Sequence, residues 1–222
     1  MVRNLKVWNW PTPGNSTLEQ LERQIADALA AGRPGAEAHL RLAPHPRPGW
    51  KAGVLPEGCR EGAALLLAYP HNGEPHVLLT VRRHDLPDHP GQVSLPGGAV
   101  EAGETVEEAA LRESEEEIGA DPFQIRILGR MSPIHIPVSS FNLYPVIGIT
   151  ADRHPWKRQD REVARILEVP LSVLQDPATL QAEERPLAGA DRQVPFFHVE
   201  GEKIWGATAM VVAEFLWMLE GR

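Results

Sequence analysis

Four charged side chains in one short segment have the types and the spacing that a metal site for phosphate chemistry needs. Glu113, Glu116 and Glu117 stand at i, i+3 and i+4, and Arg112 precedes them directly. On a helix, carboxylates at this spacing share a face and repel one another. Hard oxygen ligands are what Mg²⁺ or Mn²⁺ prefers, and such a cation would remove the repulsion. The cluster therefore predicts a divalent-cation site, although the carboxylates taken alone fit a solvated acidic helix face more simply.

The residues around this cluster predict the helix that positions it. Thr105 and Glu108 form a capping box, and Gly119 is a typical C′ glycine, so we expect a helix from about 106 to 118. The stripe that should face the core consists of Val106, Ala110 and Ile118. Before the helix, the glycines at 97, 98 and 103 should form a loop with little side-chain bulk to obstruct a phosphate.

The whole segment from 97 to 120 resembles the signature of the Nudix hydrolase family, G-x5-E-x7-R-E-U-x-E-E-x-G-U, in which U is apolar. All fixed positions match, and they are Gly98, Glu104, Arg112, Glu113, Glu116, Glu117 and Gly119. Two apolar positions depart from the pattern, because Ser114 is polar and Ala120 is small. Neither position ligates metal, so these departures bear on packing more than on chemistry.

The resemblance implies a fold, a reaction and a set of roles. The fold would be α/β, an α/β/α sandwich around a mixed sheet. Glu113, Glu116 and Glu117 would hold Mg²⁺ or Mn²⁺, while Glu104 and Arg112 would orient the helix and loop. Water would attack a phosphorus of a nucleoside diphosphate linked to another group, a reaction that depends on positioning and electrostatics. Glu116, Arg112 and Glu104 are therefore the expected catalytic residues.

The general base is left open by the sequence. A signature glutamate could serve, and so could Asp160 or Glu162, which precede an apolar run. Exposed loop charges are the simpler interpretation of both of these residues.

A second stretch narrows the substrate class. Residues 78 to 98, LLTVRRHDLPDHPGQVSLPGG, resemble the extension of the coenzyme A pyrophosphatase branch of the family. The matching positions are Arg82, His89, Gly91, Gln92, Val93 and Pro96. Leu95 stands where phenylalanine is usual, and Arg83 where a small residue is usual. With further similarity at 132–148, 161–171 and 204–216, the resemblance covers roughly residues 36 to 220.

Coenzyme A carries a 3′-phosphate besides its diphosphate, so it needs basic groups beyond the metal. Arg82, Arg83, His84 and His89 form such a cluster in the sequence, and arginine suits bidentate phosphate recognition. A simpler alternative is that Arg82 and Arg83 point to opposite sheet faces and one of them is merely solvated, and the resemblance singles out Arg82 as the binding residue. For His89, the alternative to a role in binding is a structural role in a turn. The expected substrate-binding residues are Arg82, His89, Gly97 and Gly98, and His135 and Phe141 could also line the pocket.

The organisation of the chain agrees with a mixed α/β fold. Strands are predicted at 63–69, 76–82, 92–95, 124–131 and 143–150, with a late hairpin at 196–199 and 203–205. Asn72-Gly73 is a strong hairpin signal. Helices are predicted at 16–31 and near 207–219. For the first helix, Ser16 and Glu19 form a possible capping box, and Gly32 and Pro34 end it.

Residues 43 to 58 are proline-rich and are expected to be an irregular segment lying on the main domain, or a flexible linker. Residues 1–35 are taken as an N-terminal extension and 36–222 as the hydrolase domain.

Composition excludes several other classes. The net charge of −8 argues against a nucleic-acid surface, and no apolar run approaches a membrane span. The single Cys59 permits no internal disulfide, and the first residues lack a signal-peptide core, so a cytoplasmic location is expected. The expected partner is a small-molecule nucleotide.

The N-terminal helix and the last helix could be buried in a homodimer interface, although packing in the core explains both more simply. Trp205 is also expected to pack in the core.

Three functions remain open at this point. The first is hydrolysis of coenzyme A or its thioesters to 3′,5′-ADP and a 4′-phosphopantetheine species. The second is a Nudix hydrolase acting on ADP-ribose or NADH, which fold analogy alone does not exclude. The third is a binding or regulatory module that has lost catalysis, and the intact glutamates argue against it.

Overall fold

The computed structural model describes residues 17–32, 35–47, 50–187 and 189–220, and its largest element is an eight-stranded mixed sheet. The strands of this sheet are β1 (Arg60–His71), β2 (Glu74–Arg82), β3 (Val93–Ser94), β4 (Gly97–Ala99), β5 (Arg126–Arg130), β6 (Ile134–Ile136), β7 (Phe141–Ile149) and β8 (Val163–Pro170). Five of them follow the order β3-β2-β1-β7-β5, while β4 pairs with β1, β6 with β7 and β8 with β2. The β1–β7 pair is parallel and the other pairs are antiparallel.

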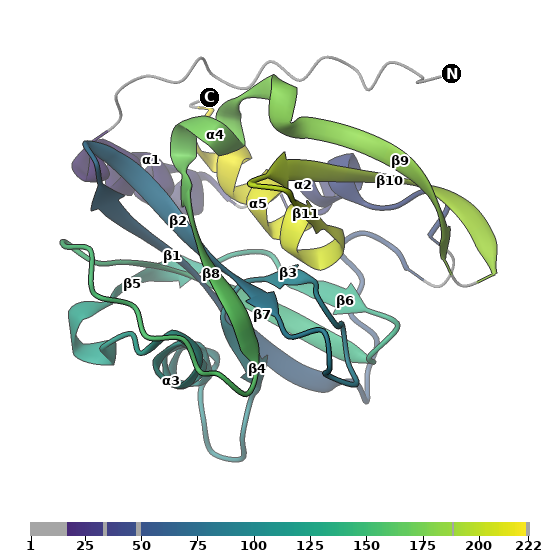
Figure 1. Ribbon diagram of the computed structural model, residues 1–222, viewed down its shortest axis with the longest axis horizontal. Helices are drawn as coiled ribbons and strands as arrows, with labels where there is room; N and C mark the ends of the chain where they lie inside the picture. The colour runs from purple at the N-terminus through teal and green to yellow at the C-terminus, as the bar shows by residue number, and fades with distance from the viewer. Residues whose placement is uncertain (1–16, 33–34, 48–49, 188, 221–222) are drawn as a thin grey trace.

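Helices and a second sheet cover the two faces of the main sheet (Figure 1). The helices are α1 (Leu18–Ala31), α2 (Gly35–Leu42), α3 (Val106–Ile118), α4 (Leu171–Gln175) and α5 (Gly206–Met218), with 3-10 turns at Pro122–Gln124 and Pro177–Thr179. The second sheet has the order β11-β10-β9 and consists of β9 (Leu180–Leu187), β10 (Ala190–Val199) and β11 (Glu202–Trp205). In Figure 1, α3 lies below the main sheet, and α5 and the second sheet lie above it. This confirms the expected α/β sandwich with a mixed sheet.

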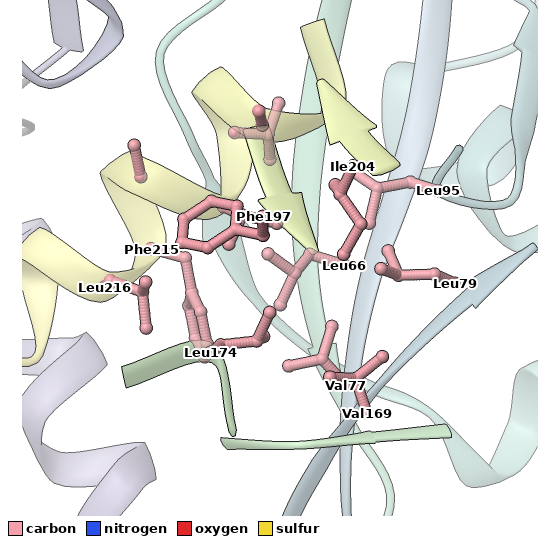
Figure 2. Close-up of a cluster of buried hydrophobic side chains, with 14 of the residues drawn as sticks. Leu66, Val77, Leu79, Leu95, Val169, Leu174, Phe197, Ile204, Phe215 and Leu216 are labelled. Atoms are coloured by element: carbon pink, nitrogen blue, oxygen red, sulfur yellow. The ribbon is translucent and has the colours of Figure 1, made fainter. Parts of the chain in front are cut away.

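The apolar run of β1 is continuous because both of its faces are buried. Alternate residues Ala63, Leu65 and Leu67 join the core cluster that contains α3, whereas Ala64 and Leu66 join the cluster that contains α5. Figure 2 shows this second cluster, in which Leu66 lies near residues of α5 and β10. A central strand packed on both sides has no solvent face, so no polar alternation is seen in its sequence.

Two hairpins follow the turn chemistry of the sequence. Asn72 and Gly73 have φ values of 50° and 87° and join β1 to β2. Glu200 and Gly201, with φ values of 50° and 82°, join β10 to β11 in the predicted late hairpin. Positive φ at both central residues matches the right-handed twist of the flanking strands.

The start of the N-terminal helix differs from the prediction by one residue. The N-cap is Thr17, which forms its capping box with Gln20, so the predicted Ser16–Glu19 pair is wrong, and Ser16 itself lies outside the described residues. Both pairs fit the S/T-x-x-E/Q pattern of a capping box, so the pattern does not distinguish them. The residue at which the helix begins decides which pair forms. Gly32 ends the helix as expected.

Other elements differ from the prediction in length or were not predicted at all. The strand predicted at 92–95 is reduced to Val93–Ser94, and the one predicted at 124–131 begins only after a 3-10 turn at Pro122–Gln124. The elements that the sequence did not indicate are α2, β4, β6, β8, α4 and β9. β9 is rich in charge and mostly half-buried or exposed, so it has no apolar period to detect.

The helix α1 belongs to the core of the molecule. Leu21 and Ile25 are fully buried in the cluster that contains α5, and Arg126 on β5 donates to Glu22 at 2.6 Å. The boundary drawn at residue 35 stays a prediction. Within the described part of the chain, no helix is both long enough and apolar enough to cross a membrane.

Candidate active site

The helix α3 carries the acidic cluster and begins and ends as its sequence predicts. Thr105 and Glu108 form the capping box in both directions, and Gly119 adopts the left-handed conformation at φ 66°. Val106, Ala110 and Ile118 are buried in the cluster between α3 and the sheet. The stripe therefore fixes the rotation of the helix, and this rotation decides where each glutamate points.

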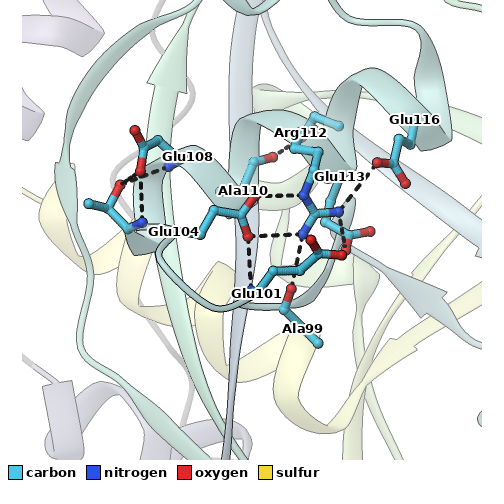
Figure 3. A network of polar contacts seen from close by, with 10 residues as sticks. Ala99, Glu101, Glu104, Glu108, Ala110, Arg112, Glu113 and Glu116 are labelled. Atoms are coloured by element: carbon cyan, nitrogen blue, oxygen red, sulfur yellow. Dashed lines mark hydrogen bonds and ion pairs between the residues drawn. The ribbon is translucent and has the colours of Figure 1, made fainter.

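Arg112 organises the acidic side chains into one network (Figure 3). Its Nε donates to Glu104 Oε1 at 2.6 Å, and its Nη1 donates to Glu113 Oε1 at 2.9 Å and to Glu116 Oε1 at 3.4 Å. Its Nη2 donates to Glu104 Oε2 and to the Ala99 carbonyl, both at 3.1 Å. Hydrogen bonds from Arg112 hold the pKa of Glu104 below its usual range. The network ties α3 to the β4 loop, as expected for residues that orient both.

The glycine loop leaves space that the site uses. β4 pairs with β1, with Gly98 opposite Ala63. A Cβ atom at Gly98 would lie 2.3 Å from Glu113 Oε1, and one at Gly97 would lie 2.3 Å from the Ala63 carbonyl oxygen. Any side chain at either position would displace a backbone or a carboxylate, so these glycines allow Glu113 to lie directly against the loop.

Glu117 is a buried carboxylate among like charges. Its residue is only 5% exposed, whereas the side chain of Glu116 is 59% exposed. Burial raises the pKa of the Glu117 carboxyl to about 8, the positive charge of Arg82 opposes this rise, and the charges of Glu113 and Glu162 add to it. Burial likewise raises the pKa of Glu113. Isolated buried carboxylates are costly unless a cation or hydrogen bonds compensate them.

The donor chemistry of the cluster fits a hard divalent cation. Among the described residues, no three histidine, cysteine, aspartate or glutamate groups already converge closely enough to hold one ion. Arg112 holds Glu113 and Glu116 in the ion pairs described above. The cluster nevertheless offers oxygen ligands only, with a cradle at Gly98 and a buried carboxylate whose ionised form a cation would stabilise. The roles of these residues in ligation stay predictions.

The structure brings Arg82 to the acidic cluster and separates it from Arg83. Arg82 lies at the end of β2, half-buried, and its charge acts on Glu117. Arg83 is bound elsewhere, because its Nη2 donates to Asp85 at 2.7 Å and its Nη1 to the Asp160 carbonyl at 2.9 Å. His89 has a positive φ of 54°, and its carbonyl accepts from Gln92 at 3.2 Å, as a turn residue would.

Of the two candidate bases outside the signature, only Glu162 acts on the cluster. Its charge contributes to the raised pKa values of Glu113 and Glu117. Asp160 is exposed and pairs with Arg158 at 3.1 Å. The loop before β8 is fixed to the end of α3, where Gln159 N–H donates to the Glu117 carbonyl at 2.8 Å. This contact spans more than forty residues of sequence, and no local pattern in the sequence indicated it.

The two departures from the signature are absorbed by local packing. Ser114 is fully buried, but its hydroxyl donates to the Ala110 carbonyl one turn earlier at 2.7 Å. Ala120 is buried in the cluster beneath α3. Both positions therefore serve packing, as the apolar positions of the signature would.

The two weaker pocket candidates, His135 and Phe141, differ in their surroundings. His135 is buried, lies 3.1 Å from Asn142 Oδ1, and lines a pocket of about 290 Å³ with Trp50, Lys51, Val54 and Pro56. Phe141 is not part of that lining and lies under Arg60. Trp205 is half-buried rather than part of the core, with the Arg185 guanidinium carbon 5.0 Å from its ring centroid, whereas its neighbour Ile204 is fully buried.

Comparison with known proteins identifies the family. The family model described as the NUDIX domain matches residues 60–188, which is more than half of the chain. The chain therefore belongs to the Nudix family, and it is an enzyme of the diphosphatase type found there. Proteins of this family generally use divalent metal ions.

The chain is similar to several individual proteins. The protein described as uncharacterized Nudix hydrolase NudL from Salmonella paratyphi B is 32% identical over 153 residues, covering 68% of this chain and 79% of the relative. Among solved structures, the Nudix hydrolase RenU from M. smegmatis is 27% identical, with a TM-score of 0.45 over 56% of this chain and 80% of that chain. The Nudix domain of Shewanella oneidensis NrtR, complexed with ADP ribose, is 21% identical, with a TM-score of 0.42 over 52% of this chain and 75% of that chain.

Proposed function

We propose that this chain cleaves the diphosphate of coenzyme A or its thioesters, releasing 3′,5′-ADP and a 4′-phosphopantetheine species. The observation that carries the proposal is that Arg82, at the end of β2, is close enough to Glu117 for its positive charge to lower the pKa of that carboxyl, while its Nε donates to the Asp88 carbonyl at 3.4 Å. Arg82 comes from the stretch at 78–98 that resembles the coenzyme A pyrophosphatase branch, and Glu117 comes from the Nudix signature. The two motifs thus contribute to one site.

Glu113, Glu116 and Glu117 are proposed to hold Mg²⁺ or Mn²⁺. When bound, such a cation neutralises charge on the diphosphate oxygens and lowers the pKa of water. Arg112 and Glu104 would fix the helix against the β4 loop, because the guanidinium spans both. This arrangement suits phosphoryl chemistry, which depends on prepositioned charge more than on covalent catalysis.

The proton of the attacking water needs an acceptor near this cluster. Glu162 is the candidate that the geometry favours over Asp160, because its charge acts on both Glu113 and Glu117 and it lies exposed at the surface. In the proposed reaction, the water oxygen forms the new bond to phosphorus, the bridging P–O bond breaks, and the water proton passes to the carboxylate. Glu162→Gln should then lower kcat while leaving metal affinity nearly unchanged.

The substrate would be held by the loop and by the basic residues next to it. Gly98 lets Glu113 lie directly against the loop, and Gly97 lets the loop pair closely with β1 at Ala63 and Ala64. In the proposed complex, the diphosphate would lie along the loop that these two glycines form. Arg82 is suited to contact a phosphate oxygen of the same group. His89 lies in a turn, and it would contribute either by shaping the 83–92 loop or by contacting the substrate directly.

A substrate panel tests this function. Turnover would be measured on coenzyme A, acetyl-coenzyme A, dephospho-coenzyme A, ADP-ribose and NADH, each with Mg²⁺, with Mn²⁺ and with a chelator. We expect metal-dependent cleavage led by the coenzyme A compounds. Metal-dependent cleavage led by ADP-ribose or NADH would keep the mechanism and reject the substrate. A folded protein that binds metal and cleaves nothing on the panel would contradict the proposal.

A further inference from the structure

Two arginines far apart in the sequence lie together on the α5 side of the sheet. Residue 45 forms an isolated bridge with residue 193, since each backbone N–H donates to the other's carbonyl, at 3.0 and 2.9 Å. This bridge brings Arg47 close to Arg192 on β10. Arg192 is 8% exposed, and its Nε is enclosed with no hydrogen-bond partner among the described residues.

The positive charges of this pair are not balanced by a carboxylate. Within the described residues, neither Arg47 nor Arg192 takes part in an ion pair. Arg47 instead donates to Met210 Sδ at 3.2 Å and stacks over Trp50, with its guanidinium carbon 4.6 Å from the ring centroid. Burial lowers the pKa of Arg47 to about 10, and the charge of Arg192 contributes to this shift.

A neighbour shows how such a charge is normally neutralised in this sheet. Arg185 stands directly opposite Arg192 in the β9–β10 ladder, and it pairs with Glu183, which also binds Lys203. The same small sheet thus provides a carboxylate for Arg185 and none for Arg192. A buried cation next to a half-buried one is costly without a counterion, and an anion between Arg47 and Arg192 would reduce this cost.

We propose that Arg47 and Arg192 bind a phosphate group. Guanidinium groups recognise phosphate oxygens bidentately, and an enclosed Nε without a partner offers a donor that no protein group uses. Met210, which Arg47 contacts, lies in the second turn of α5 and supplies no negative charge. This position is distinct from the acidic network on the other side of the sheet.

The phosphate of a bound substrate is one source for this site, and this part of the inference rests on the proposed function. The start of α5 is connected to the loop of Arg82 by two hydrogen bonds, from Thr208 Oγ1 to the Val93 carbonyl at 3.0 Å and from Arg82 N–H to the Gln92 carbonyl at 2.9 Å. A substrate phosphate would reach the Arg47–Arg192 pair only if the substrate extended from the Arg82 loop to the α5 side of the sheet. Free inorganic phosphate is the other source.

The first arm of the test needs no substrate. Thermal unfolding of the full chain would be followed in chloride and in inorganic phosphate at equal ionic strength, for wild type, Arg47→Met and Arg192→Met. Arg185→Met is the matched control, because it removes one positive charge from the opposite position of the ladder. We expect phosphate to raise the Tm of wild type and of the control, and to leave both site variants unchanged. We also expect the site variants to be at least as stable as wild type in chloride, and Arg192→Lys to recover part of the phosphate effect.

Two results would overturn the proposal. One is a wild-type Tm that does not respond to phosphate beyond chloride, and the other is an equal response in Arg192→Met. Because methionine fills the same space without charge, a variant that folds and still responds would show that phosphate binds elsewhere.

The second arm identifies the source of the phosphate by kinetics. If the site receives the substrate's 3′-phosphate, Arg192→Met should raise the KM for coenzyme A about tenfold and leave that for dephospho-coenzyme A nearly unchanged. If Arg192→Met keeps the wild-type KM for coenzyme A but loses the rise of Tm in phosphate, the site is supported and its ligand is free phosphate. If coenzyme A is not cleaved at all, the proposed function fails while the thermal arm still decides the phosphate site.

Discussion

Two buried carboxylates on two helices of this molecule have opposite surroundings. Glu214 on α5 is fully buried and accepts hydrogen bonds from the backbone N–H of Ser132 at 3.1 Å and from its hydroxyl at 2.7 Å, with His39 Nε2 at 2.9 Å. Glu117 on α3 is 5% exposed and lies among the charges of Glu113 and Glu162.

The difference separates a structural carboxylate from a functional one. Glu214 joins α2, α5 and the segment after β5 through groups that are satisfied within the protein, so it needs no ligand. The charge of Arg82 and a backbone hydrogen bond from Gly97 compensate Glu117 only in part, because burial and the like charges still raise its pKa to about 8, as expected where a cation is to bind. The same residue type thus stabilises the fold at one place and costs stability at the other.

The largest expected effect is on turnover when Glu117 becomes glutamine. Glu117→Gln keeps the shape of the side chain but removes a metal-ligating charge, so kcat should fall by on the order of a thousandfold. Glu116→Gln should act in the same direction. Glu115→Gln is the control, because this glutamate lies exposed on the same helix at a variable position of the signature. Steady-state kinetics would measure this, and wild-type turnover in both variants would contradict the metal assignment.

Replacing the structural carboxylate Glu214 should lower stability and leave turnover unchanged, which is the reverse of the effect expected at Glu117. Glu214→Ala leaves the Ser132 donors and His39 buried without their acceptor, so the free energy of unfolding should drop by about 3 kcal/mol. Urea denaturation would measure the change, and the fraction that remains folded should keep its kcat. A loss of stability smaller than that of Glu117→Gln would remove the distinction drawn between the two carboxylates.

A pH titration of stability tests the surroundings of Glu117 directly. In the folded protein its pKa is raised to about 8 from an ordinary value of 4.5. Below pH 4.5 both the folded and the unfolded chain hold the proton, and as the pH rises toward 8 only the folded chain still does. Stability of the metal-free protein should therefore fall between pH 5 and 8, by on the order of 2 kcal/mol.

The control for this titration is the variant without the titrating group. Denaturation would be measured with a chelator present, and Glu117→Gln should show a flatter profile than wild type. A metal-free wild type whose stability rises steadily from pH 5 to 8 would contradict the raised pKa.

The smallest effect is expected at the signature position that departs from the family. The Ser114 hydroxyl bonds only to a carbonyl of its own helix, and Ser114→Ala removes that bond without exposing a partner to solvent. Stability should change by less than about 1 kcal/mol, and kcat should not change. Thermal unfolding and kinetics would measure both, and a large loss of activity would show that this hydroxyl has a role beyond packing.

Much of α3 and the hairpins could be predicted because their signals are local. Capping residues, an apolar stripe and Asn-Gly turns act within a few residues, so Thr105, Gly119 and Asn72 give their elements directly. The same locality explains the misplaced cap at Ser16, since Thr17 offers an equivalent pattern one residue later. β8 and β9 were missed because their pairing partners, rather than their own periodicity, define them.

By itself, the sequence determined the family, the acidic helix and the spacing of its carboxylates, because the Nudix signature is a contiguous run whose geometry follows from one helix. Only the tertiary structure decided which of these carboxylates is buried, since burial of Glu117 depends on the loop before β8 that packs against the end of α3. It likewise brought Arg82 to that carboxylate and Arg47 to Arg192. These charges are far apart along the chain, and their interaction exists only where the packed elements exclude water and bring them together.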